Sequence, residues 1–287
     1  MVLNRFLFAG ICAGLFTVGI VILDPGGSRP VTRPQTGLRS HSPIRIHRQR
    51  ERGQYESTNW SGYAVTGANG SVTDVTASWM VPTVTCSSSP TGYSAFWVGI
   101  DGFSSNTVEQ VGTDSDCVSL NGRKTDTPTY YAWYEFYPES SYVIQLPRAV
   151  APGDVMVAEV KYLGQSVNSR HGGAAGQFTV TITDTTLGET ASVTSSVRGA
   201  QESSAEWIAE APCCTNSGGV LPLADFSSVD FSSPGATVSK STGNIASFGA
   251  NVQEITMVGE NSSSLVKAQP SGVSGGNFFV NWLNPGP

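Results

Sequence analysis

The sequence predicts an all-β protein, a sandwich of antiparallel sheets, on the strength of its composition and its pattern. The 287 residues include 32 Gly and 16 Pro, which favours many short strands joined by turns. From about residue 59 onward, short runs of Val, Ile, Thr and aromatic residues alternate with clusters of Gly, Ser, Asn and Pro. That pattern is typical of β-sandwiches, and no long stretch keeps a helical period.

The strand candidates spread over most of the chain. We expect strands at 72–81, 94–100, 130–137, 155–162, 177–184, 205–210 and 278–283. Because successive side chains of a strand point to opposite sides, three of these strands each combine an apolar face with a face that carries carboxylates beside aromatic rings. The second faces hold Tyr131, Trp133, Glu135 and Tyr137, then Trp97, Gly99 and Asp101, then Glu206, Ile208 and Glu210. Such faces predict a concave binding groove.

Charge is divided unevenly along the chain. Residues 1–56 hold eight of the 16 basic residues and three of the 22 acidic ones, which leaves a net charge of −11 on residues 57–287. An acidic body argues against nucleic acid as a partner. A basic arm in front of it favours pairing between arm and body.

The first 56 residues predict two segments outside the folded body. Residues 6–23 carry no charge, as expected of a signal peptide or a membrane anchor, so we expect an exported protein, either secreted or membrane-anchored. Residues 24–54 are rich in Pro, Arg and His without a hydrophobic period, which is typical of a propeptide or linker. The predicted division is therefore 1–23, 24–56 and 57–287.

Four cysteines follow the leader-like segment, namely Cys86, Cys117, Cys213 and Cys214. An even number in an exported chain indicates disulfides, with three possible connectivities. We favour Cys86 with Cys117 and the adjacent pair with each other. No C-x-x-C motif or histidine cluster indicates zinc, and we expect no metal and no cofactor.

Five ordered motifs resemble the eqolisin family of glutamic peptidases. They are STNWSGY at 57–63, AFWVGIDG at 95–102, EQVG at 109–112, YAWYEFYP at 131–138 and AEWIAE at 205–210. The resemblance implies a sandwich of two bent, seven-stranded antiparallel sheets, a concanavalin-like jelly roll with a concave active-site groove. It also implies an acid endopeptidase that resists pepstatin.

The same resemblance assigns roles to residues. Gln110 matches the family's catalytic glutamine and Glu210 its catalytic glutamate, whereas Glu206 does not match. The groove would be lined by Trp97, Asp101, Glu135, Trp133, Tyr137 and Trp60, with Trp60 equally compatible with core packing.

A carboxyl paired with an amide suits peptide hydrolysis. The reaction needs a water that is deprotonated as it attacks, a stabilised oxyanion and a protonated leaving nitrogen. One Glu can accept and return the proton, while Gln donates an N–H to the oxyanion without carrying charge. Because a glutamate titrates near 4.3, such a pair should work in acid on protein or peptide substrates.

Two alternatives stay open at this point. A jelly-roll β-glycanase would use Glu135 with Glu210 or Glu206, and a non-catalytic carbohydrate-binding module would stack sugars on Trp97, Trp133 and Tyr137. Serine-protease chemistry is disfavoured, because His171 lies in a loop-like context and the segment 272–276 lacks a strand-to-helix setting. Asp114 and Asp116 suggest a solvated turn more than a calcium site.

The charge division also suggests a proenzyme. Arg and His side chains of residues 24–56 would pair with carboxylates of the body and inhibit it, and acid would protonate those carboxylates and loosen the arm. We expect a monomer.

Overall fold

The structure is a computed structural model that describes residues 38–86, 91–118, 124–168, 173–214 and 218–286. The residues before 38, and with them the predicted leader, lie outside the described part, as does His171. In chain order the elements are β1 (Ile46–Glu51), β2 (Gln54–Ser57), β3 (Trp60–Thr66), β4 (Val72–Met80), β5 (Ala95–Ile100), β6 (Val108–Val118), β7 (Lys124–Tyr137), β8 (Tyr142–Ile144), β9 (Val155–Asn168), β10 (Gly173–Asp184), β11 (Glu189–Val197), β12 (Ser204–Glu210), β13 (Ser228–Val238), β14 (Ser241–Asn244), the 3-10 helix η1 (Ile245–Asn251), β15 (Val252–Gly259), β16 (Ser262–Pro270) and β17 (Phe278–Trp282).

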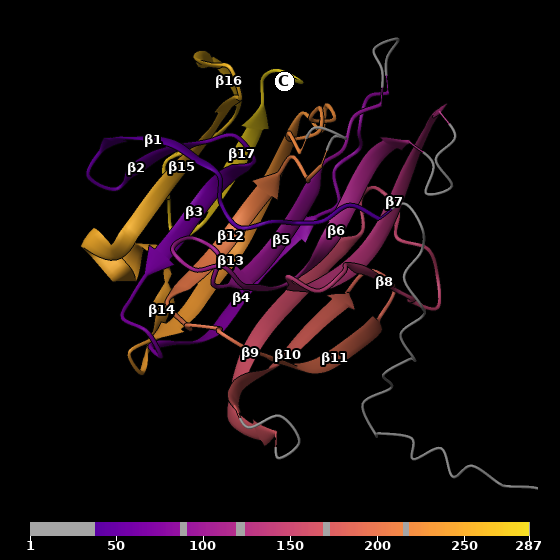
Figure 1. Ribbon diagram of the computed structural model, residues 1–287. Coiled ribbons are helices and arrows are strands. Elements are labelled where there is room, and N and C mark those ends of the chain that lie inside the picture. Colours follow the sequence, from indigo (N-terminus) through magenta and orange to yellow (C-terminus); the bar gives the residue numbers. More distant parts are fainter. Residues whose placement is uncertain (1–37, 87–90, 119–123, 169–172, 215–217, 287) are drawn as a thin grey trace, which may run out of the picture.

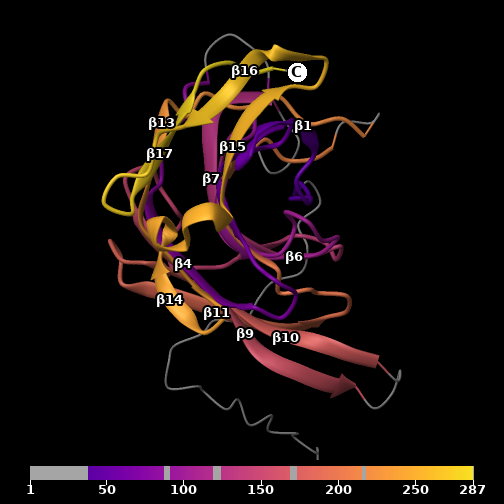
Figure 2. The same cartoon turned by 90° about the vertical axis from the view of Figure 1, so that its left-hand side faces the viewer.

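The strands form two bent layers that join along one edge (Figures 1 and 2). One layer runs β8-β7-β6-β5-β12-β3-β15, and the other runs β11-β10-β9-β4-β13-β17. β16 pairs with β15 of the first layer and with β17 of the second, which closes the edge. Among the described strand ladders only β2 with β15 is parallel. The all-β antiparallel prediction is confirmed, and each expected strand is present.

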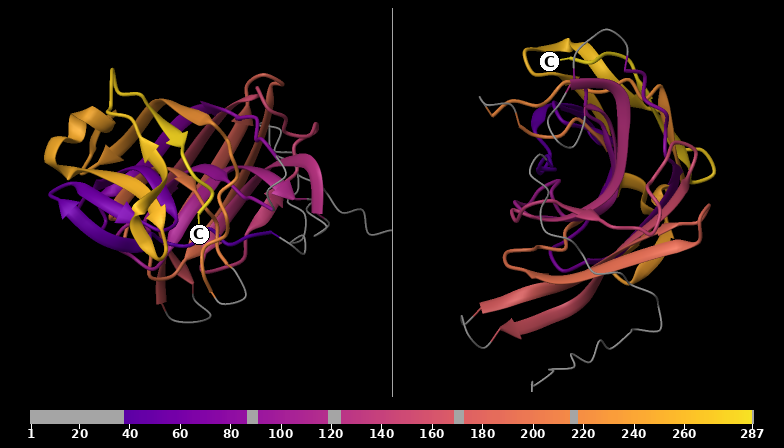
Figure 3. Two further views of the ribbon diagram at one scale, coloured as in Figure 1. Left: turned by 90° about the horizontal axis from the view of Figure 1, so that it is seen from above. Right: turned by 90° about the vertical axis from the view of Figure 1, so that its right-hand side faces the viewer.

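Strand alternation sorts the side chains of the first layer between two apolar clusters. Phe96, Val98 and Trp207 point into the core between the layers. Trp97 and Trp133 belong to a second cluster on the opposite face, which is the concave side of the bent layer (Figure 3). The predicted division of faces in β5, β7 and β12 is therefore confirmed.

Both favoured disulfides are present. Cys86 is bonded to Cys117, 31 residues away, and Cys213 is bonded to its neighbour Cys214. The second pair lies just beyond the end of β12, so it closely follows Glu210 in the chain.

The described part of the basic arm belongs to the sheet. β1 pairs with β2, and β2 extends alongside β15. Leu38, Ile44 and Tyr55 pack against the second apolar cluster. The expectation that the arm lies outside the folded body is wrong for its described part, because three widely spaced apolar side chains pack against the cluster without any hydrophobic period.

None of the helices in the described ranges is long and apolar enough to cross a bilayer.

Gly62 tests how tightly β3 and β12 approach each other, and Gly188, between β10 and β11, is its control. Gly62 has φ +144°, and a Cβ there would overlap the Trp207 carbonyl oxygen across the ladder. Gly188 has φ +69°, and a Cβ there would meet nothing within 4 Å. We expect Gly62→Ala to lower the free energy of unfolding by about 3 kcal/mol or more, and Gly188→Ala by about 1–2 kcal/mol. Urea titrations measure both, and equal losses would contradict the close approach.

Candidate active site

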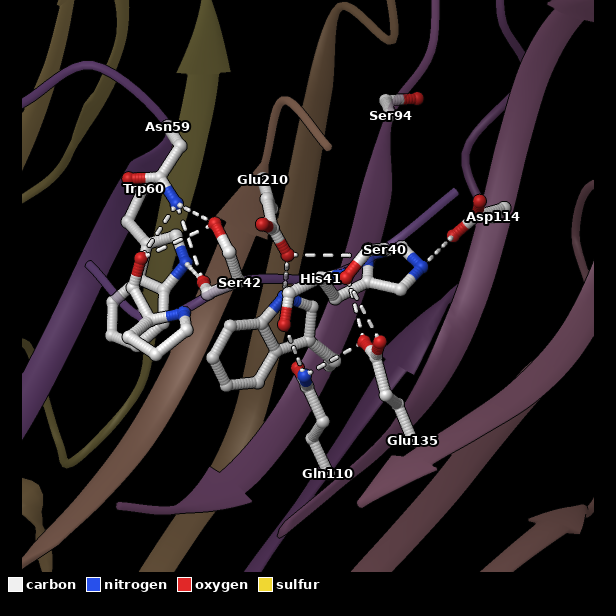
Figure 4. Close-up of polar contacts among 12 residues, drawn as sticks. Ser40, His41, Ser42, Asn59, Trp60, Ser94, Gln110, Asp114, Glu135 and Glu210 are labelled. Carbon is white, nitrogen blue, oxygen red and sulfur yellow. Dashed lines mark hydrogen bonds and ion pairs between the residues drawn. The ribbon is translucent and has the colours of Figure 1, made fainter. Parts of the chain in front are cut away.

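Neighbouring strands bring the two predicted catalytic residues to one face. Gln110 of β6 lies opposite Glu135 of β7, and Glu210 ends β12, which pairs with β5. β5 lies between β6 and β12 and contributes Trp97 to the same face. Figure 4 shows Gln110, Glu135 and Glu210 converging on a segment of the arm.

The residue at the centre of this convergence is His41. Gln110 Nε2 donates a hydrogen bond of 2.6 Å to the His41 carbonyl oxygen. The His41 backbone N–H donates to Glu135 Oε2 at 2.7 Å. Gln110 Nε2 also lies 3.3 Å from Glu135 Oε2. An amide and a carboxyl on adjacent strands thus hold both backbone polar groups of one residue.

The imidazole of His41 fills the space between Glu210 and Asp114. It stacks on Trp133 with ring centroids 3.6 Å apart and planes inclined by 6°. Its Nδ1 lies 3.2 Å from Glu210 Oε2, and its Nε2 lies 3.9 Å from Asp114 Oδ1. Trp97 Nε1 donates to the same Glu210 oxygen at 2.9 Å. The ring is 1% exposed, so the arm closes this part of the groove to solvent.

Residues on either side of His41 extend the contact across the sheet. Ser40 pairs through its backbone with Cys213, and its hydroxyl donates to Glu135 Oε1 at 3.0 Å. On the other side, Trp60 Nε1 donates to the Ser42 carbonyl at 3.2 Å. Asn59 Nδ2 donates to the same carbonyl at 3.3 Å. The arm therefore crosses from β7 to β3 as an extended peptide (Figure 4).

Burial raises the pKa of the groove carboxyls while the arm covers them. Burial raises the pKa of Glu210 well above its ordinary value, and the neighbouring Glu135 raises it further. Burial likewise raises the pKa of Glu135 to about 8 and of Asp114 to about 7. It lowers the pKa of His41 to about 3. The covered site thus favours neutral groups, and exposure to water would return each pKa toward its ordinary value.

Other predicted groove residues lie at the margins of the site. Trp60 packs edge-on against Trp97, with centroids 4.9 Å apart, and Tyr137 packs half-buried against the second cluster. Asp101 instead accepts backbone N–H groups from Gln201, Glu202 and Ser203. It anchors the loop before β12, where its carboxylate is fully engaged.

The interpretation of Asp114 and Asp116 as a solvated turn is wrong. Both lie in β6 and are buried, and the Tyr131 hydroxyl donates to each, at 2.7 and 3.2 Å. Strand alternation from Gln110 places Asp114 on the groove face, and this signal could have identified it.

Nothing in the sequence singled out His41 as the residue bound beside Gln110 and Glu210. Within the described ranges, no three His, Cys, Asp or Glu side chains are placed to hold a metal ion.

The arginines in the described part of the arm form no ion pair with the body, contrary to expectation. Arg48 and Arg50 form ion pairs with Glu56, which belongs to the arm itself. Arg39 lies over the Tyr93 ring, 4.8 Å from its centroid, and donates to its hydroxyl. Arg45 donates to the Gly218 carbonyl. Among the described residues, the arm side chains that meet carboxyls of the body are those of His41 and Ser40.

Fold and site together define a two-layer β-sandwich whose concave face holds an extended peptide beside an amide and a carboxyl. The chain belongs to the peptidase A4 family, which matches residues 58–277. This is the eqolisin family that the five sequence motifs resemble, so the predicted family is confirmed. Membership in a peptidase family favours peptide hydrolysis over the glycanase and carbohydrate-binding alternatives.

Two curated relatives share part of their length with this chain. Aspergillopepsin-2 of Aspergillus niger is 30% identical over 208 residues, 65% of this chain and 66% of that protein. Scytalidopepsin B of Scytalidium lignicola is 33% identical over 144 residues, 48% of this chain and 49% of that protein. The chain thus matches just under two thirds of the first relative and about half of the second.

Solved structures show the same fold at lower identity. A crystal structure of scytalido-glutamic peptidase with a transition state analog inhibitor aligns with a TM-score of 0.60 at 24% identity, over 79% of this chain and 98% of that one. An eqolisin in a complex with the tripeptide Ala-Ile-His aligns with a TM-score of 0.58 at 23% identity, over the same shares of the two chains.

A second group of carboxyls lies buried away from Gln110. Glu109 and Glu206 are both 0% exposed. Burial raises the pKa of each well above its ordinary value, and Asp101 raises both further. A carboxyl with a raised pKa in the folded state binds its proton more tightly than in the unfolded chain. Its contribution to stability is complete below the unfolded pKa, about 4.3, and is lost as pH rises toward the folded pKa.

We therefore expect the protein to lose stability between about pH 4 and pH 7. Glu206→Gln keeps the side-chain shape but cannot ionise, so its melting temperature should fall less over that range. A difference on the order of 1 kcal/mol corresponds to about 2–4 °C for a domain of this size. Glu139, which is exposed, provides the control Glu139→Gln. Melting curves of Glu206→Gln that follow the wild type at every pH would contradict the assignment.

Proposed function

We propose that this protein is an exported acid endopeptidase in which Gln110 and Glu210 form the catalytic dyad. The observation that carries the proposal is the pair of contacts to His41, in which Gln110 holds the backbone carbonyl and Glu210 faces the same residue. Peptidase A4 membership supports the reaction class. The tripeptide held by a structural relative supports an extended peptide as the ligand.

The chemistry follows from the donors and acceptors of the two side chains. Glu210 Oε1 and Gln110 Oε1 meet no hydrogen-bond partner among the described residues, so both can accept from a water. Glu210 takes a proton as that water attacks the carbonyl carbon, and Gln110 Nε2 donates to the developing oxyanion. Glu210 then returns the proton to the leaving nitrogen. Acid suits this cycle because the neighbouring carboxyls stay neutral.

Glu135 acts by holding the substrate backbone. It accepts the N–H of the residue whose carbonyl Gln110 binds, and its raised pKa keeps it protonated beside Glu210 in acid. A protonated carboxyl accepts through its carbonyl oxygen, as the amide of Gln does. To bind the substrate N–H, the side chain at position 135 needs the shape of Glu and an acceptor oxygen, and it does not need a negative charge.

Substitutions at the dyad test the function. We expect Gln110→Ala to lower kcat for casein in acid by about 10²–10³, the value of one oxyanion donor. Glu210→Gln should lower it by about 10²–10⁴, since proton transfer is lost. Initial rates with and without pepstatin measure both effects, and wild-type activity should resist the inhibitor. Casein cleavage by Gln110→Ala at the wild-type rate would refute the dyad.

The variant Glu135→Gln distinguishes a mechanism in which Glu210 alone transfers protons from one in which Glu135 and Glu210 both do. Because Gln keeps the acceptor for the substrate N–H, we expect kcat to stay within about tenfold of the wild type. The pH–rate profile of this variant should extend to higher pH, since a second ionisation beside Glu210 no longer occurs. A loss as large as that of Glu210→Gln would assign Glu135 a direct part in proton transfer.

A further inference from the structure

We propose that the peptide bond between His41 and Ser42 is the bond at which this protein processes its own N-terminal arm. The inference rests on the proposed function, because it takes the arm as the first substrate of the dyad. It goes further by naming the scissile bond and the residue that becomes the new N-terminus.

The first observation is which carbonyl reaches the oxyanion donor. Gln110 Nε2 lies 2.6 Å from the His41 carbonyl oxygen, and the N–H of the same residue is held by Glu135. The neighbouring carbonyls point to other partners, since Ser40 pairs with Cys213 and Ser42 accepts from Trp60. The arm is therefore held in one register, with the carbonyl of His41 at the site of attack.

The second observation is that the chain is held differently on the two sides of this bond. After it, the Ile44 N–H donates to the Gly102 carbonyl, and the Arg45 backbone pairs with Asn59 Oδ1 and with the Thr58 N–H. β1 then begins and joins the sheet through β2. These contacts would keep the new terminus at Ser42 attached to the sandwich after the bond is cut.

Before the bond, few contacts hold the chain to the body. Ser40 makes two backbone hydrogen bonds to Cys213 and one hydroxyl bond to Glu135. Arg39 contacts Tyr93, and Leu38 packs at the rim of the second cluster. Cleavage would remove the covalent link to Ser42, so the described residues 38–41 would be held by these contacts and those of His41 alone, and the segment could exchange with a substrate in the groove.

The hydrolysis consumes one water and needs no other reactant. The water oxygen bonds to the His41 carbonyl carbon while Glu210 accepts a water proton, and the bond from that carbon to the Ser42 nitrogen breaks with its electron pair on nitrogen. Glu210 then gives the proton to that nitrogen. The products are a carboxyl group on His41 and a free amine on Ser42. The imidazole contacts Glu210 Oε2, and Oε1, which has no hydrogen-bond partner among the described residues, accepts from the attacking water.

Full-length protein transferred from neutral buffer to about pH 4 tests the assignment. Intact mass and N-terminal sequencing over time should show a new terminus at Ser42, absent in Glu210→Gln. The half-time should be the same at low and high protein concentration, because the arm reaches the groove of its own chain. Casein cleavage in the same sample should show a lag that ends as the Ser42 terminus appears.

Two histidines provide a matched pair of variants. His41→Ala removes the stacking on Trp133 and one hydrogen bond, so we expect the Ser42 terminus to form about tenfold more slowly. Casein should then displace the weakened arm and be cleaved without the lag. His47 lies exposed on β1, and His47→Ala should process like the wild type.

The outcomes separate the two proposals. Casein cleavage by a chain that stays intact at His41, or that is cut elsewhere in the arm, overturns the assigned bond and leaves the peptidase standing. A new terminus that also forms in Glu210→Gln overturns it as well. Failure to cleave either casein or the arm, by both the wild type and His41→Ala, overturns the proposed function itself.

Discussion

The groove depends on the two-residue alternation of side chains across β7, β6, β5 and β12. In these strands the alternation sends one set of residues into the core between the layers and the other set to the concave face. Gln110, Glu135 and Glu210 fall in the second set. Gln110 lies opposite Glu135 across the β6–β7 ladder, and Glu210 lies on the same face in the row of Asp114. A shift of one residue in β6 would turn Gln110 toward the core and Glu109 toward the groove.

The same face concentrates acids where water is scarce. Asp114 and Glu210 face the His41 imidazole and Glu135 holds the His41 backbone N–H, and burial raises the pKa of all three carboxyls. Ionising them together would combine desolvation with repulsion between like charges. The arrangement is therefore most stable in acid, where neutral carboxyls serve as hydrogen-bonding groups. An uncharged Gln in the dyad fits this setting, because it adds a donor without adding a charge.

The sequence predicted the strands because alternation is a local pattern repeated over several segments, and the family motifs predicted that Gln110 and Glu210 share one face. It failed where a role depends on contacts between distant residues. His41 is 69 residues from Gln110, and no periodicity in the arm marks it. Asp114 and Asp116 were predicted to lie in a turn because a polar Asp-Ser-Asp sequence resembles one. In the structure they lie in a buried strand, where the Tyr131 hydroxyl donates a hydrogen bond to the carboxyl of Asp114. Asp101 lies at the end of the predicted strand, but its carboxylate accepts backbone N–H groups of the loop before β12 and does not line the groove.

The position of the arm connects the charge pattern to the chemistry. A basic segment beside an acidic body suggested surface ion pairs, yet the arginines pair within the arm or with neutral groups. The contact that closes the groove is an imidazole held by stacking, with its peptide group bound as a substrate would be. Covering the dyad proposed above removes water and raises the pKa of Glu210, so the ionised form that accepts the water proton is the minor form while the arm is bound. Opening the groove reverses that burial, which links removal of the arm to activation of the carboxyl.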